Sequence, residues 1–458
     1  MEIRFRLNGE DVTLDVIDPT VTLLDWLRET RGLTGTKEGC NEGDCGACSV
    51  MVTDAGGAKA LNACILFMPQ LDGCAVRTVE GIAGEAMHPV QEAMVTHHAS
   101  QCGFCTPGFV VSMATAHLNG RTDHADQIAG NLCRCTGYAP ILRAAHAAQD
   151  APVPEHMRDT APKAAATAAA SKEAGWAMPT STDALATLYA DDPNATLVAG
   201  ATDVGLWVTK QHRDLGNVIF LKQCRDLAQI TETDAGLRIG AGVTIAAMRS
   251  TVQSAYPALG EMLRRYGSEQ VRQAATIGGN IANGSPIGDT PPALIAMNAT
   301  LQLRHRATRR DLPLEDFFVE YGKQDRAPGE FVESITIPHQ PAPTRIYKLS
   351  KRFDQDISAV CGAFRFTVEQ GLITQARIAF GGMAGTPKRA RRIEAALEGR
   401  PLQLETLGLT DPIWEAEFTP LSDARGSAAY RLEAARNMLR RAVLEDLGAS
   451  TSVLEVSP

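Results

Sequence analysis

The stretch CNEGDCGAC at residues 40–48 decides how the first part of this chain folds. Its three cysteines have the spacing C-x4-C-x2-C, and fifteen residues intervene before a fourth cysteine, Cys64. This is the plant-type spacing for a [2Fe–2S] cluster. Small residues between the cysteines let the loop wrap closely and present backbone N–H groups to sulfur. Structural zinc is the alternative, although zinc sites usually pair two short C-x2-4-C knuckles.

A second cysteine set lies further along the chain. It consists of CGFC at residues 102–105 and CRC at residues 133–135, and nine of the eleven cysteines of the chain lie before residue 136. The CGFC segment precedes a predicted helix, and helix N-termini favour the negative charge of a thiolate-ligated cluster. Taken alone, CGFC could be a thioredoxin-like redox pair. With the CRC pair it indicates a second cluster, so the predicted metal ligands are Cys40, Cys45, Cys48, Cys64, Cys102, Cys105, Cys133 and Cys135.

Composition narrows the class of protein. A length of 458 residues predicts three or four domains, and a net charge of −9 leaves no basic footprint for nucleic acid or anionic lipid. The N-terminus alternates charged and bulky residues instead of forming an export signal, and no apolar run is long enough to span a membrane. We therefore expect a cytoplasmic protein in a reducing compartment, where crowded cysteines bind metal and do not form disulfides.

Hydrophobic patterns predict the local structure. They indicate a hairpin over residues 1–17, a helix capped by Thr22 and a loop over residues 34–48. Thr106 is the expected N-cap of a later helix, with Pro107 in its first position. A further helix is expected to start near residue 138.

The rest of the chain mixes both element types. Residues 152–172 are rich in Ala, Pro, Thr and Lys, which predicts a linker. Short β-type runs then alternate with helical segments, and a boundary is expected near residues 338–343. The tail ends in a long amphipathic helix from Ala428. The unassigned cysteines Cys74, Cys224 and Cys361 lack partners at metal spacing and are expected to be buried free thiols.

Two glycine-bearing segments lie beyond the linker. In LVAGATDVG at residues 197–205 a β-run enters a turn of small residues, whose backbone N–H groups can cradle a pyrophosphate. It lacks G-x-G-x-x-G, so a Rossmann fold is unsupported, and taken alone a plain turn is the better interpretation. The second segment, ATIGGNIANGSP at residues 275–286, ends near Asp289 and offers many hydrogen-bond donors.

The cysteine motifs carry a family resemblance. EGCNEGDCGAC at residues 38–48, QCGFCTPG at residues 101–108 and GNLCRCTGY at residues 130–138 resemble the molybdenum hydroxylase (xanthine oxidase) family. That family includes xanthine dehydrogenases, aldehyde oxidases and bacterial carbon monoxide dehydrogenases. The resemblance implies that the cluster held by the second set lies nearest the molybdenum cofactor. It also implies that Gln101 hydrogen-bonds the pterin of that cofactor.

The two glycine-bearing segments resemble the FAD domain of the same family, a domain of the vanillyl-alcohol-oxidase type. The resemblance implies FAD contacts at Leu197, Val198, Ala199, Gly200, Ala201, Thr202, Asp203, Val204, Tyr266, Ala275, Thr276, Ile277, Gly278, Gly279, Asn280, Ser285, Asp289, Val332 and Lys348. Core packing is the alternative for Tyr266. The segment KRFDQDI at residues 351–357 resembles a loop near the flavin of xanthine dehydrogenases, whose charge tunes the choice between NAD and oxygen. A solvated charged loop is the alternative.

The resemblance implies a multidomain α+β fold. Its expected parts are a β-grasp ferredoxin-like domain over residues 1–80, a four-helix-bundle [2Fe–2S] domain over 81–151, the linker, an FAD-binding domain over 173–340, and a small α+β C-terminal flavoprotein domain over 341–458. The resemblance is closest to the small iron–sulfur/FAD subunit of a bacterial xanthine dehydrogenase, because no molybdopterin segment is visible. A large molybdopterin-binding partner, in a dimer of heterodimers, is therefore expected.

The expected function is electron transfer. Electrons from the partner's oxidation of hypoxanthine or xanthine to urate would pass through two [2Fe–2S] clusters to FAD and then to NAD. No catalytic residue is expected on this chain. The same role in an aldehyde or other N-heterocycle dehydrogenase, a free-standing diaphorase or redox sensor, and a non-enzymatic zinc-binding module are the alternatives.

Overall fold

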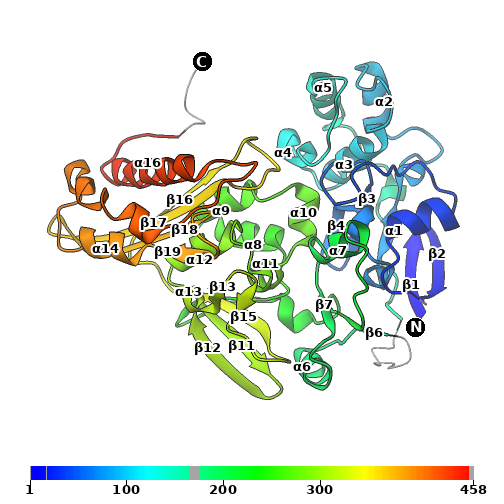
Figure 1. Cartoon of the computed structure of the whole chain (residues 1–458). Coiled ribbons are helices and arrows are strands. Elements are labelled where there is room, and N and C mark those ends of the chain that lie inside the picture. The colour runs from blue at the N-terminus through cyan, green and yellow to red at the C-terminus, as the bar shows by residue number, and fades with distance from the viewer. Residues whose placement is uncertain (1, 17, 166–174, 453–458) are drawn as a thin grey trace. The chain divides into compact units, whose positions relative to one another are not determined.

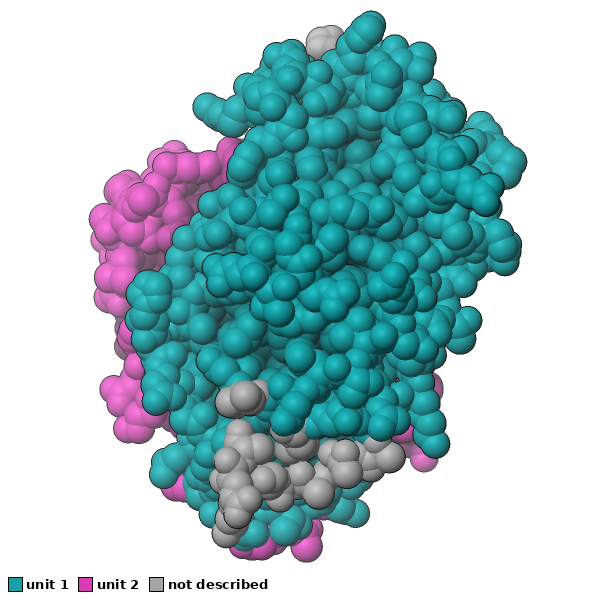
Figure 2. All heavy atoms as spheres, turned by 90° about the vertical axis from the view of Figure 1, so that its right-hand side faces the viewer, with its two compact units in different colours: residues 1–225, 267–275 teal, residues 226–266, 276–458 magenta. Residues whose placement is uncertain are grey.

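The structure is a computed structural model that describes residues 2–16, 18–165 and 175–452. The chain divides into two units, which are coloured separately in Figure 2. Unit 1 comprises residues 1–225 and 267–275, and unit 2 comprises residues 226–266 and 276–458. Across the described ranges, no helix combines the length and apolar character that crossing a membrane requires.

Unit 1 begins with a five-stranded sheet in the order β2-β1-β5-β3-β4 (Figure 1). Its strands are β1 (Glu2–Leu7), β2 (Glu10–Asp15), β3 (Ser49–Asp54), β4 (Gly57–Asn62) and β5 (Ala75–Arg77). Strands β1 and β2 pair antiparallel, which confirms the predicted hairpin apart from residues 1 and 17, outside the described residues. Because side chains alternate along a strand, Ile3, Phe5 and Leu7 of β1 all enter the core.

The predicted helix after the hairpin is also present. Helix α1 (Leu23–Asp25) continues directly into a π-helical turn, Trp26–Thr30. Thr22 caps it as expected, because its hydroxyl accepts a hydrogen bond from the Asp25 N–H at 3.1 Å. The loop over residues 34–48 contains no helix or strand, as predicted.

Helices dominate the next part of unit 1. They are α2 (Pro89–Thr96), α3 (Thr106–Leu118), α4 (His124–Ile128) and α5 (Ala139–Ala148). Helix α3 starts one residue earlier than predicted, since Cys105 is its N-cap and Thr106 is its first helical residue. The cause is local, because the Cys105 carbonyl accepts the N–H of Phe109 and so opens the helical ladder.

The first half of the predicted linker is folded onto this region. Met157, in the 3₁₀ turn Glu155–Met157, is completely buried. Arg77 of β5 forms an ion pair with Asp159, and both side chains are 7% exposed. The remaining linker positions, 166–172, lie outside the described residues.

Unit 1 is completed by a parallel sheet in the order β6-β8-β7, with its helices. The elements are β6 (Trp176–Ala177), α6 (Thr182–Asp191), β7 (Thr196–Val198), α7 (Val204–Thr209), β8 (Val218–Phe220) and α10 (Glu269–Ala274). Trp176, Val198 and Phe220 share one core cluster with the five-stranded sheet.

Unit 2 contains two larger sheets, β12-β11-β15-β10-β9 and β16-β17-β18-β19, and the small pair β13-β14. The strands are β9 (Ile230–Thr233), β10 (Gly236–Gly240), β11 (Thr300–His305), β12 (Thr308–Pro313), β13 (Phe318–Glu320), β14 (Lys323–Gln324), β15 (Phe331–Ile337), β16 (Thr344–Leu349), β17 (Val360–Glu369), β18 (Leu372–Gly381) and β19 (Lys388–Arg389). The helices are α8 (Ile245–Val252), α9 (Pro257–Arg264), α11 (Ile277–Asn283), α12 (Thr290–Ala296), α13 (Leu314–Phe317), α14 (Arg391–Leu397), α15 (Trp414–Glu417) and α16 (Ala428–Asp446). The mixture confirms a multidomain α+β fold, and α16 is the predicted C-terminal helix, which packs against β17 (Figure 1).

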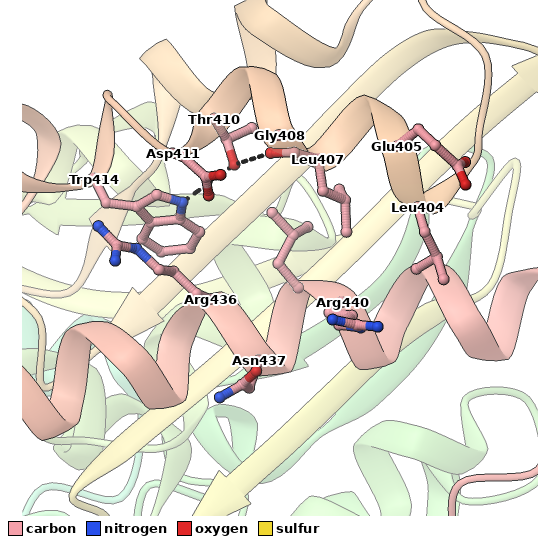
Figure 3. A pocket seen from close by; sticks show the side chains of 11 residues that line it. Leu404, Glu405, Leu407, Gly408, Thr410, Asp411, Trp414, Arg436, Asn437 and Arg440 are labelled. Carbon is pink, nitrogen blue, oxygen red and sulfur yellow. Dashed lines mark hydrogen bonds between the residues drawn. The ribbon is translucent and has the colours of Figure 1, made fainter.

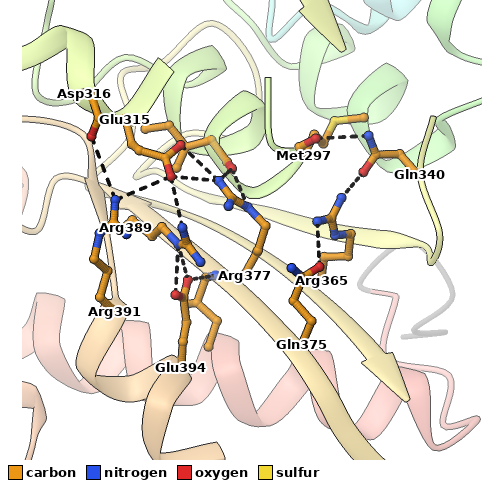
Figure 4. Close-up of polar contacts among 12 residues, drawn as sticks. Met297, Glu315, Asp316, Gln340, Arg365, Gln375, Arg377, Arg389, Arg391 and Glu394 are labelled. Carbon is orange, nitrogen blue, oxygen red and sulfur yellow. Dashed lines mark hydrogen bonds and ion pairs between the residues drawn. The ribbon is translucent and has the colours of Figure 1, made fainter. Parts of the chain in front are cut away.

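A buried polar network joins the parts of unit 2 (Figure 4). Glu315 of α13 forms ion pairs of 3.0 Å with both Arg377 of β18 and Arg389 of β19. Glu394 of α14 pairs with Arg389 at 2.9 Å. Arg365 of β17 donates to the amide oxygens of Gln340 and Gln375, and burial lowers its pKa to about 10. The network therefore holds the C-terminal sheet and α13 in one arrangement.

Candidate redox-cofactor sites

The first cysteine set gathers beside the five-stranded sheet. Cys40, Cys45 and Cys48 come from the loop that leads into β3, and Cys64 comes from the 3₁₀ turn after β4. The thiols contact one another in two pairs, Cys40 with Cys45 and Cys48 with Cys64, and the charge of Cys40 also acts on Cys64. The structure therefore brings all four predicted ligands together.

Backbone N–H groups point at the sulfurs of this set. The N–H groups of Asp44 and Cys45 donate to the Cys40 sulfur at 3.4 and 3.2 Å, and the Cys40 N–H donates to the Cys45 sulfur at 3.3 Å. The hydrogen bond with the Cys45 thiol and these backbone donors lower the pKa of Cys40 to about 5. The contact with Cys48 and burial raise the pKa of Cys64. Such donors are what a ligand loop of a negatively charged cluster requires.

Two glycines allow this loop to turn so tightly. Gly43 and Gly46 have φ of +77° and +68°, a region that side chains rarely adopt. A Cβ on Gly46 would lie 2.3 Å from the Gly130 carbonyl oxygen, and one on Gly43 would lie 2.5 Å from Ile65. The loop is therefore closely packed on both sides.

The second set is assembled by helices. Cys102 lies just before α3, Cys105 is the N-cap of α3, and Cys133 and Cys135 lie in the loop between α4 and α5. The thiols again contact in two pairs, Cys102 with Cys135 and Cys105 with Cys133. The spacing did not indicate this pairing, which connects the two segments twice.

The surroundings of this second set are more open. Cys102 and Cys135 are exposed, whereas Cys133 is buried. Burial and the contact with Cys133 raise the pKa of Cys105 to about 12, while the Phe104 N–H is the main cause that lowers the pKa of Cys102. Gln101, the residue expected to contact the pterin, is exposed beside Cys102.

The thiols of both sets are arranged in contacting pairs. A [2Fe–2S] cluster is held by two thiolates on each of two irons, and such pairs suit that arrangement. Among the described residues, no group of three or more His, Cys, Asp or Glu side chains forms a site for a single metal ion.

The first predicted FAD segment leaves four backbone donors available in unit 1. Residues 197–198 end strand β7, and α7 begins at Val204. Between them, no described residue accepts a hydrogen bond from the N–H groups of residues 200–203. Gly200 is required there, since a Cβ would lie 1.9 Å from the Ala274 carbonyl oxygen, and Ala201 has φ of +57°. Burial raises the pKa of Asp203. Free N–H groups in such a turn fit a pyrophosphate.

The second predicted FAD segment differs from the first, because its backbone N–H groups already donate hydrogen bonds within the chain. Ala275 ends the stretch that belongs to unit 1, and Thr276 caps helix α11 through a 3.2 Å hydrogen bond from the Gly279 N–H. The N–H groups of Ile277 and Gly278 donate to main-chain carbonyls just after β10. The expected abundance of donors at this turn is therefore not found, and the side chains of the segment are what remains for a ligand.

Within unit 2 several other predicted residues meet. The Tyr266 hydroxyl accepts a 2.9 Å hydrogen bond from the Asn280 side chain. Asp289 and Lys348 form a 2.6 Å ion pair with 7% and 3% side-chain exposure, and the Ser358 hydroxyl donates to Asp289 at 2.5 Å. Of the remaining two, Ser285 lies in the turn after α11, and Val332 is buried in β15.

The charged loop over residues 351–357 is fixed by an arginine that the sequence did not single out. Arg265 donates to the Phe353 carbonyl at 2.9 Å and to the Lys348 carbonyl at 2.9 Å. Its guanidinium also lies 4.4 Å from the centre of the Phe353 ring. The only signal for this role was its position next to Tyr266.

Three further cysteines and one cavity lie outside the two cysteine sets, and the Cys361 sulfur lies 3.7 Å from the Asp289 carbonyl oxygen. Cys74, Cys224 and Cys361 are buried, as predicted, and the Lys222 ammonium lies 2.6 Å from the Cys74 sulfur. A cavity of about 480 Å³ lies between α16 and the 3₁₀ helix Leu404–Thr410, with Arg436 and Arg440 on one wall (Figure 3).

Comparison with known families assigns every part of this arrangement. Residues 5–68 match the 2Fe-2S iron-sulfur cluster binding domain, and residues 78–146 match the [2Fe-2S] binding domain. Residues 170–340 match the FAD binding domain in molybdopterin dehydrogenase, and residues 345–446 match the CO dehydrogenase flavoprotein C-terminal domain. The chain thus carries two [2Fe–2S]-binding domains and an FAD-binding domain.

Among curated proteins, the chain is similar to xanthine dehydrogenases. It is 31% identical to the xanthine dehydrogenase of Emericella nidulans over 99% of this chain and 40% of that protein. It is 31% identical to the xanthine dehydrogenase/oxidase of Mus musculus over 88% of this chain and 35% of that protein. The chain therefore spans about two fifths, or less, of the length of these relatives.

Solved structures match more than half of the chain. The reconstituted CO dehydrogenase from Oligotropha carboxidovorans matches with a TM-score of 0.54 and 27% identity, over 58% of this chain and 94% of that chain. CO dehydrogenase from Hydrogenophaga pseudoflava matches with a TM-score of 0.55 and 28% identity, over the same shares. Quinoline 2-oxidoreductase from Pseudomonas putida 86, at 24% identity and a TM-score of 0.55, shares the fold over 59% of this chain and 95% of its own.

Proposed function

Since the chain belongs to the molybdenum hydroxylase (xanthine oxidase) family, we propose that it is the electron-transfer subunit of an NAD-linked xanthine dehydrogenase. The observation that carries the proposal is the pair of four-cysteine sets with an FAD-binding domain after them on one chain. Electrons taken from hypoxanthine or xanthine on a large molybdopterin-binding partner would reach FAD, and finally NAD, by way of two [2Fe–2S] clusters. The partner is proposed because this chain matches two fifths or less of its xanthine dehydrogenase relatives.

In electron transfer, the bound clusters and flavin would carry the electrons, and the residues of the chain would hold these groups and tune them. Iron–sulfur clusters carry single electrons, and a flavin can hold two and deliver a hydride, which is the chemistry these groups supply when bound. The chain's own residues hold and tune them. Backbone donors at Cys40 and Cys45 stabilise negative charge on sulfur, and burial of Cys48 and Cys64 excludes water from the first set.

The flavin assignments are proposed residue by residue. The available N–H groups of residues 200–203 would bind the pyrophosphate of FAD, and Gly200 keeps this turn free of side-chain obstruction. Tyr266, held by Asn280, would lie beside the isoalloxazine, and the Asp289–Lys348 pair would supply charged contacts. We extend the same proposal to the other predicted FAD positions, and to Gln101 as the contact to the partner's pterin.

The first experiment measures iron, acid-labile sulfide, flavin and molybdenum in the purified native protein with whatever co-purifies. The proposal predicts about four irons and one FAD per chain, with molybdenum on a larger companion. Zinc without flavin would contradict it and favour a structural metal protein. A stable monomer with iron and FAD but no companion would favour a free-standing diaphorase.

Substrate and acceptor assays on the complete complex test the finer proposal. Turnover of xanthine with NAD supports a xanthine dehydrogenase. Turnover of an aldehyde or another N-heterocycle, with xanthine inert, contradicts that substrate and retains the electron-transfer role. Light scattering tests whether the complex is a dimer of heterodimers. Oxygen replacing NAD as acceptor would contradict the proposed NAD-linked activity.

A further inference from the structure

The two cysteine loops meet at one place within unit 1. The Leu132 N–H donates to the carbonyl of Cys45 at 2.9 Å. The Asn131 side-chain amide donates to the Gly46 carbonyl at 2.9 Å. A ligand of the first set is therefore one hydrogen bond away from the residue before Cys133, a ligand of the second set.

Glycines make this approach possible. A Cβ on Gly46 would lie 2.3 Å from the Gly130 carbonyl oxygen, and a Cβ on Gly108 would lie 2.2 Å from the Gly46 carbonyl oxygen. A Cβ on Gly130 would lie 2.0 Å from the side-chain oxygen of Gln270. No room exists at the contact for even one added carbon, so the two loops pack directly against each other through their main chains.

Gln270 closes the contact from the other side. Its side-chain N–H group lies 3.1 Å from the Asn131 amide oxygen and 3.2 Å from the hydroxyls of both Ser49 and Ser112. Gln270 is 1% exposed, and Asn131, Ser49 and Ser112 are equally well buried. Ser49 comes directly after the first cysteine loop, Ser112 belongs to α3, and Asn131 lies in the second cysteine loop. One amide therefore reaches the segments that carry both sets.

Burying the Gln270 side chain destabilises the fold in one respect, so packing alone does not explain why a glutamine stands here. Its side-chain oxygen is buried and has no hydrogen-bond partner among the described residues. A buried acceptor without a partner destabilises the folded state. The Gln270 side-chain nitrogen donates to three acceptors, although the side-chain oxygen of the same amide has no partner among the described residues. A buried network of this kind specifies one geometry, because every alternative would leave more groups unpaired.

We propose that Gln270 is a positioning residue for electron transfer, which sets the separation and orientation of the two cluster-binding loops through Asn131, Ser49 and Ser112. This inference rests on the proposed function, since it presumes two clusters. It adds a residue from helix α10, in the chain's FAD-binding region, to the part of the molecule that holds the iron–sulfur sets. Within the described ranges, the side-chain hydrogen bonds of Gln270 go to Ser49, Ser112 and Asn131 and not to a cysteine thiol, so its effect acts through the loops.

The test substitutes Gln270→Leu in the complete protein as purified with its companions. Gln273→Leu is the matched control, since Gln273 lies on the same helix but donates only to Glu269, at 2.7 Å. The readouts are iron and flavin content, the magnetic splitting between the two reduced clusters in electron paramagnetic resonance, and their rate of equilibration after photoreduction. We expect normal iron and flavin in Gln270→Leu, an altered splitting, and equilibration slowed roughly tenfold, because such steps depend on ångström-scale geometry.

Ser112→Ala is the milder variant and removes one acceptor of the network. It should alter the splitting in the same direction by a smaller amount, and it decides the matter if Gln270→Leu fails to retain iron. An unchanged splitting and rate in either iron-replete variant would overturn the inference, as would the same change in Gln273→Leu. Failure of the proposed function is separately visible, because the unaltered protein would then contain no iron or flavin.

Discussion

The two cysteine sets contain the same number of thiols, each arranged in two contacting pairs, and they differ in what surrounds them. In the first set, Cys48 and Cys64 are buried, and the loop glycines have neighbours within 2.5 Å of where a Cβ would stand. In the second set, Cys102 and Cys135 are exposed, and the loop glycine Gly137 has open space around it. One site is enclosed by its own chain and the other is open.

This difference indicates a division of roles. An enclosed cluster is tuned by the donors and burial that its own chain supplies, whereas an open one is also tuned by whatever covers it. The second set is thus suited to contact another molecule, whereas the first is insulated by its own chain. Substitution, acid and chelation each test whether the two sites differ in this way.

The largest effect is expected from replacing one ligand in each set. Cys64→Ser should remove about half of the iron and also lower the free energy of unfolding, because a buried hydroxyl without a partner costs about 1–3 kcal/mol. Cys135→Ser should remove the same share of iron with a smaller loss of stability, since its side chain is exposed. Iron analysis and chemical denaturation measure both. Equal losses of stability would mean that the two sites are enclosed alike.

A matched glycine pair tests the packing without touching a ligand. Gly46 and Gly137 have nearly the same φ, +68° and +66°, but only Gly46 is crowded. Gly137→Ala should cost about 1 kcal/mol through backbone strain alone, whereas Gly46→Ala should cost about 4 kcal/mol through strain and overpacking. Denaturation curves give both values. Similar costs for the two substitutions would contradict the enclosed character of the first loop.

Acid should destabilise the helical region of unit 1 more than the five-stranded sheet, because the chain has no histidine before His88. Burial, together with the charges of His117 and His156, lowers the pKa of His88 to about 4, and its Nδ1 accepts the Val90 N–H at 3.1 Å. Since the unfolded chain binds this proton more readily, stability is complete above pH 6.5 and falls as the pH drops toward 4. The loss should approach roughly 3 kcal/mol.

His88→Gln is the test variant, with thermal unfolding recorded from pH 7.5 down to about 4. The helical region should lose its pH dependence in this range, while the five-stranded sheet behaves as before. A slope that persists in His88→Gln would assign the proton to another group.

The smallest effect concerns the order in which iron is lost. An added chelator or mild oxidant should remove the iron of the second set first, because attack depends on exposure. Electron paramagnetic resonance distinguishes the two signals during the treatment. Simultaneous loss of iron from both sets would mean that the exposed thiols are covered in the native complex. Repeating the experiment after removal of the companion would show whether the companion covers them.

Features that depend on spacing and periodicity could be predicted from the sequence. The hairpin and the Thr22 cap were readable, because each depends on residues close together in the chain, and the eight cysteines proposed as ligands gather in two sets. The pairing of Cys102 with Cys135 was not, since it depends on how two helices meet. The number of backbone donors available at the turn after Thr276 was overestimated, because the sequence does not show that nearby carbonyl groups already accept from these N–H groups.

Gln270 shows the limit most clearly. Its helix reads EQVRQA, which is polar enough to predict a solvated surface. Instead Glu269, Gln270 and Arg272 are all buried. A buried polar helix can be recognised only when its partners are known, and those partners lie more than one hundred residues earlier in the chain.

The return of residues 267–275 to unit 1 has a consequence for biosynthesis. The ribosome delivers the chain from its N-terminus, and domains generally fold as they emerge. Both cysteine loops are made early, but the helix that contains Gln270 emerges only after the intervening residues 226–266, which belong to the other unit. The two iron–sulfur sites therefore reach their final spacing late in translation, and a nascent chain stalled before residue 270 would present both sets to the assembly machinery in an unlocked state.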